Sequence, residues 1–476
     1  MKVKRLKMRS FRAIADLTLE FETDGPIVLI GDNGTGKTSI LDCIRILLSY
    51  FVVRILFDSE TREEFQQNPS QPRNITRNTG IRRFPPPPPG VNHPAYHLGI
   101  RQKDLFKECE FSQYDIKKGD QETANEIEIY LGYEQAQWSV HTMQKREKIE
   151  TSSELSELEP VADIIRNGWQ ESSYFNIPLI AYYPVNRSVE DIPLINLNDN
   201  LFNFPQPEYD STALEAYDEA ISLSPVSFQS FFQWFKERED VENEGLRDDT
   251  AHRDKQLNAV RQAIDSILEE EGFTNLRIRR NKPIAHMTVK KKGQELSIDQ
   301  LSDGEKCLLA MVGDWARRLA IANPSLDNPL EGKGLLLIDE IDLHLHPKWQ
   351  RHIIPALTKT FPNCQLIVTT HSPQVVSHVK PEGIYILKTT SEGTVAECPP
   401  YSFGRDSNRI LEDVMGVPAR PLEIKNRLKT LFKLIDEGNI AKARECQKEL
   451  EQEIGVEEPE FAGAEALIRR KEILGR

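Results

Sequence analysis

The segment that most restricts how this chain can fold is the octapeptide at residues 31–38, G-D-N-G-T-G-K-T, which lies between a short apolar run and a segment of helical spacing. Glycines let backbone N–H groups surround phosphate oxygens, and the start of the following helix adds partial positive charge. We expect Lys37 to reach the β- and γ-phosphates and Thr38 to hold magnesium. A strand–loop–helix unit of this kind predicts a nucleotide-binding α/β sheet. The expected nucleotide contacts are Gly31, Asp32, Asn33, Gly34, Thr35, Gly36, Lys37, Thr38 and Ser39.

Two acidic residues follow a second apolar run. Residues 335–338, L-L-L-I, suit a buried strand, and Asp339 and Glu340 come directly after it. Ligands bind at the carboxyl ends of strands in open α/β sheets, which is where this pair would lie. Neighbouring side chains at a strand end point to different sides, so the two acids can serve separate roles. We expect Asp339 to coordinate magnesium through its water shell and Glu340 to polarise the attacking water.

A serine, a glycine and a histidine complete the set of candidate residues. Ser302 and Gly304 open a predicted helix over 307–320, where a hydroxyl and free N–H groups can form an anion site. His371 follows another apolar run, residues 365–369. There it would face the same sheet edge and bond the γ-phosphate or the attacking water. The expected catalytic residues are Lys37, Glu340 and His371.

The order of these segments resembles the ABC-type ATPases of the SMC, RecF and OLD kind. Residues 31–38 look like the Walker A motif of that family, residues 301–306 like its signature motif, and residues 339–340 like Walker B. His371 resembles its switch histidine, and Asp303 stands where many members have glycine. In this family two heads enclose ATP and Mg²⁺. The resemblance therefore implies a slow or regulated ATP hydrolase that forms a homodimer or a higher homo-oligomer.

The same resemblance implies roles that the motifs alone do not. Ser302 and Gly304 would act across the dimer on nucleotide held by Lys37 of the other copy. Asp342 would lie near the dimer seam. Arg12, within an S-F-R segment, resembles a family arginine that approaches the nucleotide. The candidates for the family's Q-loop residue are Gln135 and Gln137.

A closer resemblance is to the compact bacterial defence ATPases called PtuA, which occur in Septu and retron systems. It rests on A-Y-Y-P-V-N-R at 181–187, E-I-D-L-H-L-H-P at 340–347 and I-R-R-K-E-I-L-G at 468–475. The resemblance implies a partner HNH nuclease of the PtuB kind and, in retron versions, a reverse transcriptase with RNA-linked DNA (msDNA) and its non-coding RNA. The chain itself lacks a D-x-D cluster after His371, so we expect no nuclease site of its own. The alternative is a RecF- or SMC-like repair ATPase that binds DNA directly, and a transporter ATPase is a third hypothesis.

The expected fold is α/β: an ABC-ATPase-type head with a mostly parallel sheet flanked by helices and an antiparallel β piece near the N-terminus. Residues 1–50 and 271–420 would form the two parts of the head. Residues 51–270 would be a helical insertion with some strands and a proline run at 85–89. Residues 421–476 would be a helical tail, whose apolar stripe favours either packing onto the head or docking of a partner. The stripe is Ile424, Leu428, Leu431, Phe432 and Ile435.

Composition argues against several other classes. The formal net charge is −14, which disfavours nonspecific duplex binding by the whole surface, although arginines between residues 73 and 83 could form a local basic patch. No apolar stretch has the length of a membrane helix and no signal core follows the start, so we expect a cytoplasmic protein without a membrane partner. The six cysteines form no C-x-x-C pair, so we expect no zinc site. His344 and His346 share the spacing of metal ligands on a strand, but residues 343–347 are better interpreted as a loop of the ATPase.

Overall fold

The computed structural model describes residues 1–59, 62, 110–132, 134–145, 148–172, 174–187, 195–196, 212–223, 228–281, 284–391 and 393–474. Its contacts divide the chain into two compact units, Met1–Arg405 and Asp406–Arg476. The proline run at 85–89 and the arginines between residues 73 and 83 lie outside the described residues. None of the helices in the ranges above combines the length and apolarity needed to cross a membrane.

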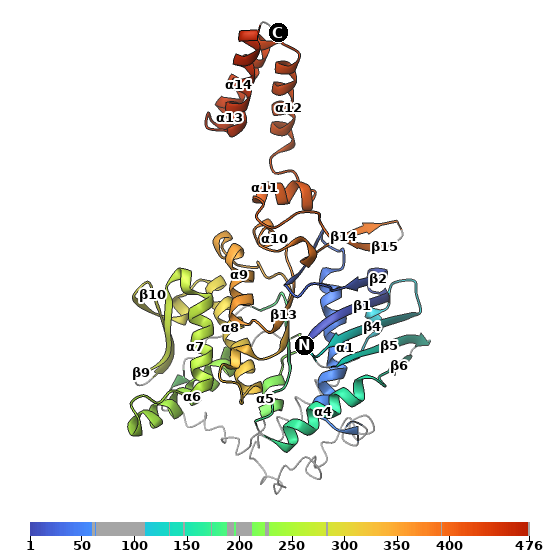
Figure 1. Cartoon of the computed structure of the whole chain (residues 1–476), viewed down its shortest axis with the longest axis vertical. Helices are drawn as coiled ribbons and strands as arrows, with labels where there is room; N and C mark the ends of the chain where they lie inside the picture. The colour runs from blue at the N-terminus through green and yellow to red at the C-terminus, as the bar shows by residue number, and fades with distance from the viewer. Residues whose placement is uncertain are drawn as a thin grey trace. The chain divides into compact units, whose positions relative to one another are not determined.

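A six-stranded sheet forms the centre of the first unit (Figure 1). Its strands, in spatial order, are β15 (Gly393–Glu397), β14 (Ile384–Thr390), β3 (Ile27–Gly31), β13 (Cys364–Thr369), β12 (Gly334–Ile338) and β7 (Leu179–Tyr183). All neighbours pair in parallel except β14 and β15, which are antiparallel. The central strands are short apolar runs that are buried along nearly their whole length, as a parallel sheet covered on both faces requires.

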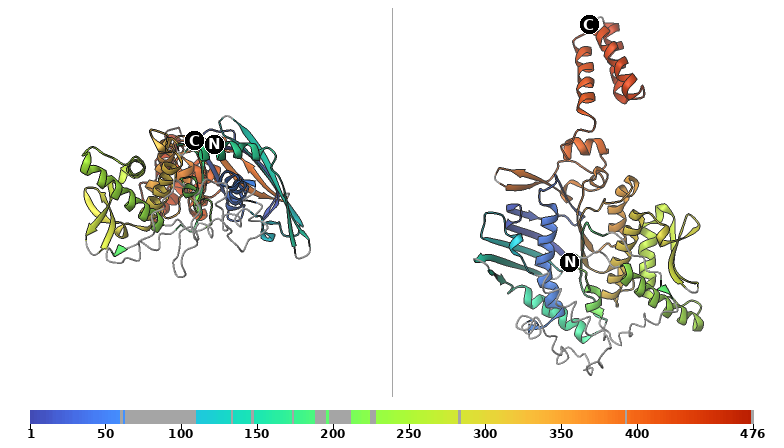
Figure 2. Two further views of the ribbon diagram at one scale, coloured as in Figure 1. Left: turned by 90° about the horizontal axis from the view of Figure 1, so that it is seen from below. Right: turned by 180° about the vertical axis from the view of Figure 1, so that it is seen from behind.

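Helices cover both faces of this sheet. Figures 1 and 2 place α1 (Lys37–Leu56) on one face and α8 (Asp303–Ala322) and α9 (Pro347–Thr360) on the other. Gly334 of β12 lies directly under Trp315 of α8, where an added Cβ would come 3.0 Å from the indole ring. This close packing fixes α8 on the sheet and thereby fixes the position of its first residues.

A second sheet, antiparallel throughout, packs against α1. Its strands, in spatial order, are β2 (Ile14–Glu20), β1 (Lys2–Phe11), β4 (Glu122–Tyr130), β5 (Gln135–Lys145) and β6 (Lys148–Glu154). Buried and exposed residues alternate along β4, so one face of the sheet is apolar. Trp138 of β5 donates a 3.0 Å hydrogen bond to the carbonyl of Leu47, and α4 (Leu158–Glu171) also packs on α1. Part of the expected insertion, residues 51–270, therefore supplies three strands here and β7 to the other sheet.

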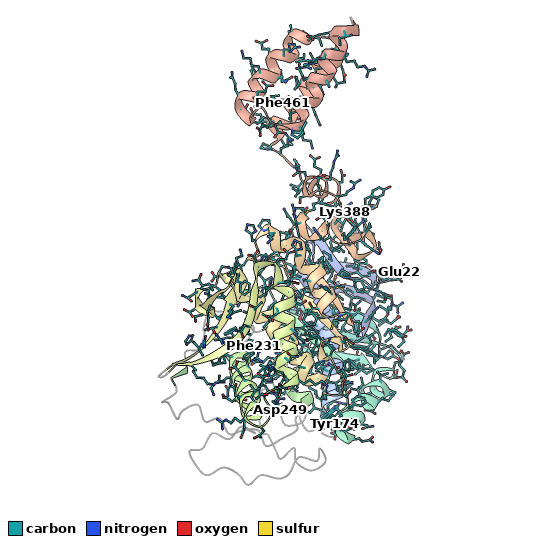
Figure 3. All side chains as sticks on the ribbon, turned by 60° about the vertical axis from the view of Figure 1, so that its left-hand side comes forward. Glu22, Tyr174, Phe231, Asp249, Lys388 and Phe461 are labelled. Carbon is teal, nitrogen blue, oxygen red and sulfur yellow. The ribbon has the colours of Figure 1, made fainter. Side chains whose placement is uncertain are left out.

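The remainder of the first unit is a helical layer with a small sheet. The helices are α5 (Thr212–Tyr217), α6 (Phe228–Asp248), α7 (Lys255–Ile267) and the short α10 (Pro373–Val376), and the strands are β8 (Ile195–Asn196), β9 (Phe273–Asn281), β10 (Ile284–Lys291) and β11 (Gln294–Ser297). Phe231 of α6, labelled in Figure 3, lies where a Cβ on Gly313 of α8 would be. Lys292 and Gly293 form the turn between β10 and β11, with φ values of 50° and 85°.

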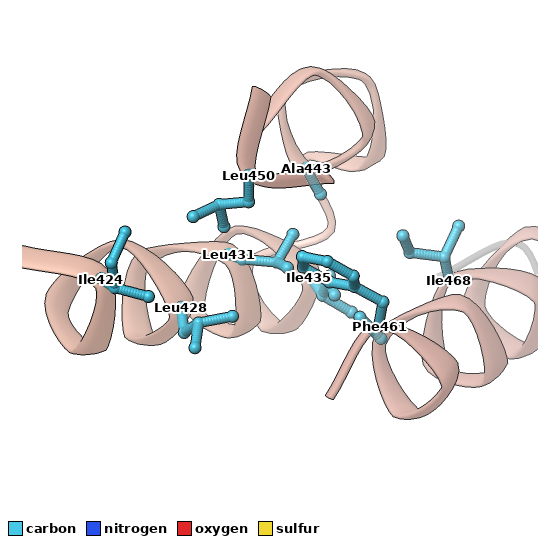
Figure 4. Packing of buried hydrophobic residues seen from close by; sticks show 9 residues of the cluster. Ile424, Leu428, Leu431, Ile435, Ala443, Leu450, Phe461 and Ile468 are labelled. Atoms are coloured by element: carbon cyan, nitrogen blue, oxygen red, sulfur yellow. The ribbon is translucent and has the colours of Figure 1, made fainter. Parts of the chain in front are cut away.

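The second unit is a bundle of three helices, α12 (Leu422–Asp436), α13 (Ile440–Ile454) and α14 (Pro459–Leu474), after a short α11 (Ser407–Arg409) and a π-helical turn, Ile410–Val414. Gly438 and Gly455 end α12 and α13 with positive φ, as glycines at helix C-termini commonly do. Figure 4 shows the apolar stripe of α12 facing residues of α13 and α14. The stripe thus forms the core of its own bundle, because three short amphipathic helices must bury their apolar faces on one another. The core comprises Ile424, Leu428, Leu431, Ile435, Ala443, Leu450, Phe461, Ala464 and Ile468.

These two units confirm the expected α/β class. The sheet that carries the phosphate loop is mostly parallel and flanked by helices, the sheet near the N-terminus is antiparallel, and the C-terminal part is helical.

Candidate nucleotide-binding site

The phosphate loop, Asp339, Glu340 and His371 lie at one edge of the six-stranded sheet. The strands β3, β12 and β13 run parallel, so the segments that follow them lie at the same edge. The Oγ1 atom of Thr38, in the first turn of α1, donates a 2.8 Å hydrogen bond to Oδ2 of Asp339, which follows β12. Residues more than 300 positions apart in the sequence are thereby brought into direct contact.

The loop at residues 31–36 leaves the first N–H groups of α1 open to a ligand. Gly36 precedes the helix with φ of 102°, no side chain caps it, and the first turn contains no acidic residue. Gly31 also needs its freedom, because a Cβ there would lie 2.5 Å from the carbonyl oxygen of Leu387. Asp32, Asn33 and Gly34 are exposed around this helix start. Unpaired N–H groups and the positive end of a helix dipole make this loop suited to phosphate.

Lys37 is folded back into its own loop. Its ammonium donates to the carbonyl oxygens of Gly31 at 2.9 Å and Asp32 at 3.0 Å. Burial lowers the pKa of Lys37, and the nearby carboxylates of Glu340 and Asp339 oppose that effect. A phosphate oxygen would offer this buried ammonium a charged partner in place of two neutral carbonyls.

The hydroxyl and carboxylate groups at the strand ends fit a magnesium ion. Asp339 is buried, and its Oδ1 accepts a 2.5 Å hydrogen bond from Thr369 while its Oδ2 accepts the bond from Thr38. Magnesium prefers oxygen ligands and commonly binds one or two protein groups together with phosphate oxygens and water. Over the described ranges, no group of three or more His, Cys, Asp or Glu could hold a metal alone. Thr38 and Asp339 would therefore need nucleotide oxygens and water to complete the shell.

The backbone turns sharply at Glu340. This residue has φ of 48°, in the left-handed region that non-glycine residues seldom adopt. Its N–H donates to Oγ1 of Thr369 at 2.7 Å, and its carbonyl accepts from the N–H of Leu343 at 2.9 Å. Strained residues of this kind cluster at functional sites, where their surroundings hold them in place.

His371 and Asp342 lie in two segments that are tied together. The carboxylate of Asp342 accepts a hydrogen bond from the hydroxyl of Thr370 and a 3.4 Å bond from the N–H of His371. Gln350 of α9 donates to the carbonyl of Leu345 at 2.8 Å. The loop after β12 is therefore anchored both to the histidine segment after β13 and to the helix that follows the loop.

Ser302 and Gly304 stand at the start of α8. Ser302 is exposed and caps the helix, and its N–H donates to Oε2 of Glu305 at 3.0 Å. Gly304 is buried, because a Cβ there would lie only 2.2 Å from the carbonyl oxygen of His344. The glycine thus allows α8 to approach the loop after β12. His346 caps α9 through a 3.2 Å bond from the N–H of Lys348, consistent with the interpretation of this segment as a structural loop.

Arg12 is held by two carboxylates. It donates to Oδ2 of Asp42 in α1 at 2.5 Å and to Oδ1 of Asp115 at 2.9 Å. Burial opposes ionisation, yet Asp42 and Asp115 raise the pKa of the Arg12 guanidinium. Arg12 therefore links the antiparallel sheet to α1, and a contact with nucleotide stays a prediction that requires it to release these partners.

The two candidate glutamines lie on β5 in the antiparallel sheet. Gln135 donates to Glu128 at 2.6 Å, and Gln137 accepts from Arg5 at 3.1 Å. At the edge where the phosphate loop lies, β12 pairs with β7 on the side opposite to β13, and residues 184–187 follow β7. Neither glutamine belongs to this segment. The Q-loop role of either glutamine stays a prediction.

Sequence reasoning missed two residues at this edge. Thr369 bonds both Asp339 and Glu340, and Arg187 donates to the backbone carbonyls of the same two residues. The available signals were the threonine pair before His371 and the arginine that ends the A-Y-Y-P-V-N-R segment.

Comparisons with known proteins identify the family of this chain. The family model described as "AAA ATPase domain" matches residues 1–376. The chain is similar to "Retron Vc95 probable ATPase" of Vibrio cholerae serotype O1 biovar El Tor, with 28% identity over 94% of this chain and 85% of that protein. It is also similar to "Septu protein PtuA" of Bacillus thuringiensis, with 34% identity over 33% of this chain and 42% of that protein. A solved structure, an SMC head bound to the C-winged helix domain of ScpA, aligns with 83% of this chain and 98% of that chain at 13% identity and a TM-score of 0.42.

Proposed function

Because this chain belongs to the AAA ATPase domain family, we propose that two copies close around ATP and Mg²⁺, hydrolyse the ATP, and thereby control a partner nuclease in bacterial anti-phage defence. The observation that carries the proposal is the 2.8 Å contact between Thr38 and Asp339, which unites the phosphate loop with the acidic strand end. The similarity to retron and Septu proteins supports the defence setting.

Nucleotide binding would begin at the start of α1. The open N–H groups of the loop receive phosphate oxygens, and Lys37 exchanges its two carbonyl partners for the β- and γ-phosphates. Thr38 and Asp339 would hold Mg²⁺, which would supply positive charge that stabilises the phosphates and the transition state. Thr369 keeps the Asp339 carboxylate in position through its hydrogen bond to Oδ1.

Hydrolysis would depend on residues just beyond the strand ends. Glu340 accepts a hydrogen bond from the attacking water and orients it toward the γ-phosphorus, while His371 contacts the γ-phosphate or that water. The bond from water oxygen to the γ-phosphorus forms as the bond from that phosphorus to the ADP oxygen breaks, and the proton that the water loses passes to the carboxylate of Glu340. Asp342 ties the Glu340 turn to the His371 segment, so both groups move as one unit.

The second copy would complete the site. Ser302 is exposed at the start of α8, where its hydroxyl and the helix N-terminus can meet a phosphate held by Lys37 of the partner copy. Closure then requires ATP in the site, and hydrolysis reopens the pair. The closed state is the one that would act on the nuclease, and hydrolysis ends it. We therefore propose that turnover is slow or regulated, so that the closed state persists.

The partner nuclease is proposed to be of the HNH type and to dock on the C-terminal bundle. The stripe of α12 is used inside the bundle, so the docking surface we propose is the outer face of α14 around Ile473, a residue that is 84% exposed. This face carries Ala462, Glu465, Ala466, Arg469, Arg470 and Ile473. In a retron setting a reverse transcriptase with msDNA would join the same complex.

Co-purification tests this proposal. The chain is expressed with its native neighbouring genes, purified with ATP and Mg²⁺, and its bound proteins and nucleic acids are identified by mass spectrometry and sequencing. We expect an HNH nuclease, and a reverse transcriptase with RNA-linked DNA if the setting is a retron. The Ile473→Glu variant should lose the nuclease but keep ATP hydrolysis. A lone homodimer that holds duplex DNA only with ATP contradicts the proposal and supports a RecF- or SMC-like repair ATPase.

A further inference from the structure

The strand that carries Asp339 and Glu340 is held at its end from both sides. β12 lies between β7 and β13, and each neighbour contributes one side chain at or just beyond its own end. From the β13 side, Thr369 accepts the N–H of Glu340 at 2.7 Å. From the β7 side, Arg187 donates to the carbonyl of Glu340 at 2.5 Å and also to the carbonyl of Asp339.

Arg187 is suited to hold two carbonyls at once. Its residue is only 5% exposed, and its guanidinium also donates to the carbonyl of Pro184 at 3.1 Å. The planar guanidinium presents several donors in fixed directions, whereas a lysine ammonium is a single compact centre on a flexible stem. Consecutive carbonyls that converge on one guanidinium fix the backbone between them. That backbone includes the left-handed conformation of Glu340.

The charge of Arg187 also matters at this position. Three acids, Asp339, Glu340 and Asp342, follow β12 within four residues, and their mutual repulsion disfavours a compact turn. Burial lowers the pKa of Arg187, and Cys307 and these carboxylates oppose that effect. A permanently charged guanidinium on the backbone of the turn offsets this repulsion.

Arg187 is also in contact with the helix that starts at Ser302. The thiol of Cys307 in α8 donates to the carbonyl oxygen of Arg187 at 3.4 Å. Arg187 therefore contacts the backbone of Glu340 through its guanidinium and helix α8 through its carbonyl. The Cys307→Ala substitution removes the second contact and leaves the first.

We propose that Arg187 is a positioning residue that holds the backbone of Glu340 in its left-handed conformation and thereby directs the catalytic carboxylate at the attacking water. This inference rests on the proposed ATPase function. Arg187 also holds the carbonyl of Asp339, but the carboxylate of that residue is held separately by Thr369 and Thr38, so loss of Arg187 changes turnover and leaves nucleotide affinity intact.

The test compares Arg187→Met with a matched variant, Arg166→Met. Arg166 is 8% exposed and likewise donates to two backbone carbonyls, those of Arg54 and Phe57, but it belongs to α4. For each folded variant, kcat is measured together with the dissociation constant of a fluorescent ATP analogue with Mg²⁺. We expect Arg187→Met to lower kcat on the order of tenfold to a hundredfold, as small misplacements of a catalytic group do, with the dissociation constant unchanged within about twofold. Arg166→Met should change neither value.

A double variant decides whether Arg187 acts through Glu340. In a Glu340→Gln background, Arg187→Met should lower the residual rate by less than about twofold, because residues that act as a unit are not additive. Arg187→Lys should recover only part of the rate. An equal loss in both backgrounds, a parallel loss of nucleotide affinity, or full activity of Arg187→Met would each overturn the inference. An inactive wild-type chain in the same assay instead contradicts the proposed function.

Discussion

Gly304→Ala is the substitution whose effect can be worked out most directly from the structure. The new Cβ would lie 2.2 Å from the carbonyl oxygen of His344, and Cβ atoms essentially never approach an atom closer than 3.0 Å. The oxygen belongs to backbone, and His344 already has φ of 61°. Neither side can move without disturbing α8 or the loop after β12, so the substitution strains both.

Two opposing terms set the size of the effect. Alanine is favoured over glycine in a helix by at most about 1 kcal/mol. Overpacking a tight contact costs about 1–3 kcal/mol. An approach of 2.2 Å to a backbone oxygen places the cost in the upper part of that range, about 2–3 kcal/mol, so we expect a net loss of about 1–2 kcal/mol. For a unit of about 400 residues, the unfolding entropy is about 0.8 kcal/mol/K, which corresponds to a Tm lower by about 1–3 °C.

Calorimetry of the full chain measures this change, with Gly463→Ala as the control. Gly463 lies inside α14, where a Cβ would meet nothing within 4 Å, so alanine there should stabilise its unit by about 0.5–1 kcal/mol. The two units need not unfold together, so hydrogen exchange of α8 and α14 amides assigns each effect to its unit. A Gly304→Ala protein that melts at or above the wild-type temperature would refute the packing of α8 on His344.

Three further predictions concern the phosphate loop, the helix start and a buried carboxylate. Lys37→Ala should abolish ATP binding measured by calorimetry without unfolding the chain, and retained affinity would contradict the role of the loop. Ser302→Arg should leave ATP binding by each copy intact but prevent ATP-driven dimers in light scattering, and normal dimers would rule out a shared site. Asp314 is fully buried, which raises its pKa, but Arg318 and Arg317 outweigh burial and lower the pKa to about 2 from its ordinary 3.8. Its roughly 2 kcal/mol of stability is present above pH 3.8 and is lost as pH falls toward 2. Urea unfolding of wild type and Asp314→Asn should therefore differ most near neutral pH and converge near pH 2, and a constant difference would contradict this assignment.

The sequence was most informative for the strands of the central sheet, because a strand that is buried on both faces is a continuous apolar run. The apolar runs at 27–30, 335–338 and 365–369 are all strands of the central sheet. The candidate residues follow directly after these strands, so each must lie close to the end of its strand. The positions of Lys37 and Asp339 at one edge followed from these patterns alone.

Contacts between distant segments could not be predicted in this way. β1 pairs with β4 across more than 100 residues, and the alternation along each strand does not reveal its neighbour. The bonds of Arg12 with Asp115 and of Arg187 with the carbonyl of Glu340 depend on that tertiary arrangement. The stripe of α12 illustrates the same limit, because its spacing predicts a buried helix face but does not identify what buries it.

The association state of Glu340→Gln shows whether two copies form the site around ATP. This variant keeps the phosphate loop and the magnesium residues but loses the carboxylate that orients water. Size-exclusion chromatography with light scattering should find a stable dimer with ATP and Mg²⁺, a monomer with ADP, and ATP turnover far below the wild-type rate. A Glu340→Gln chain that stays monomeric with ATP and Mg²⁺, or that hydrolyses ATP at the wild-type rate, would contradict a site formed by two copies around ATP.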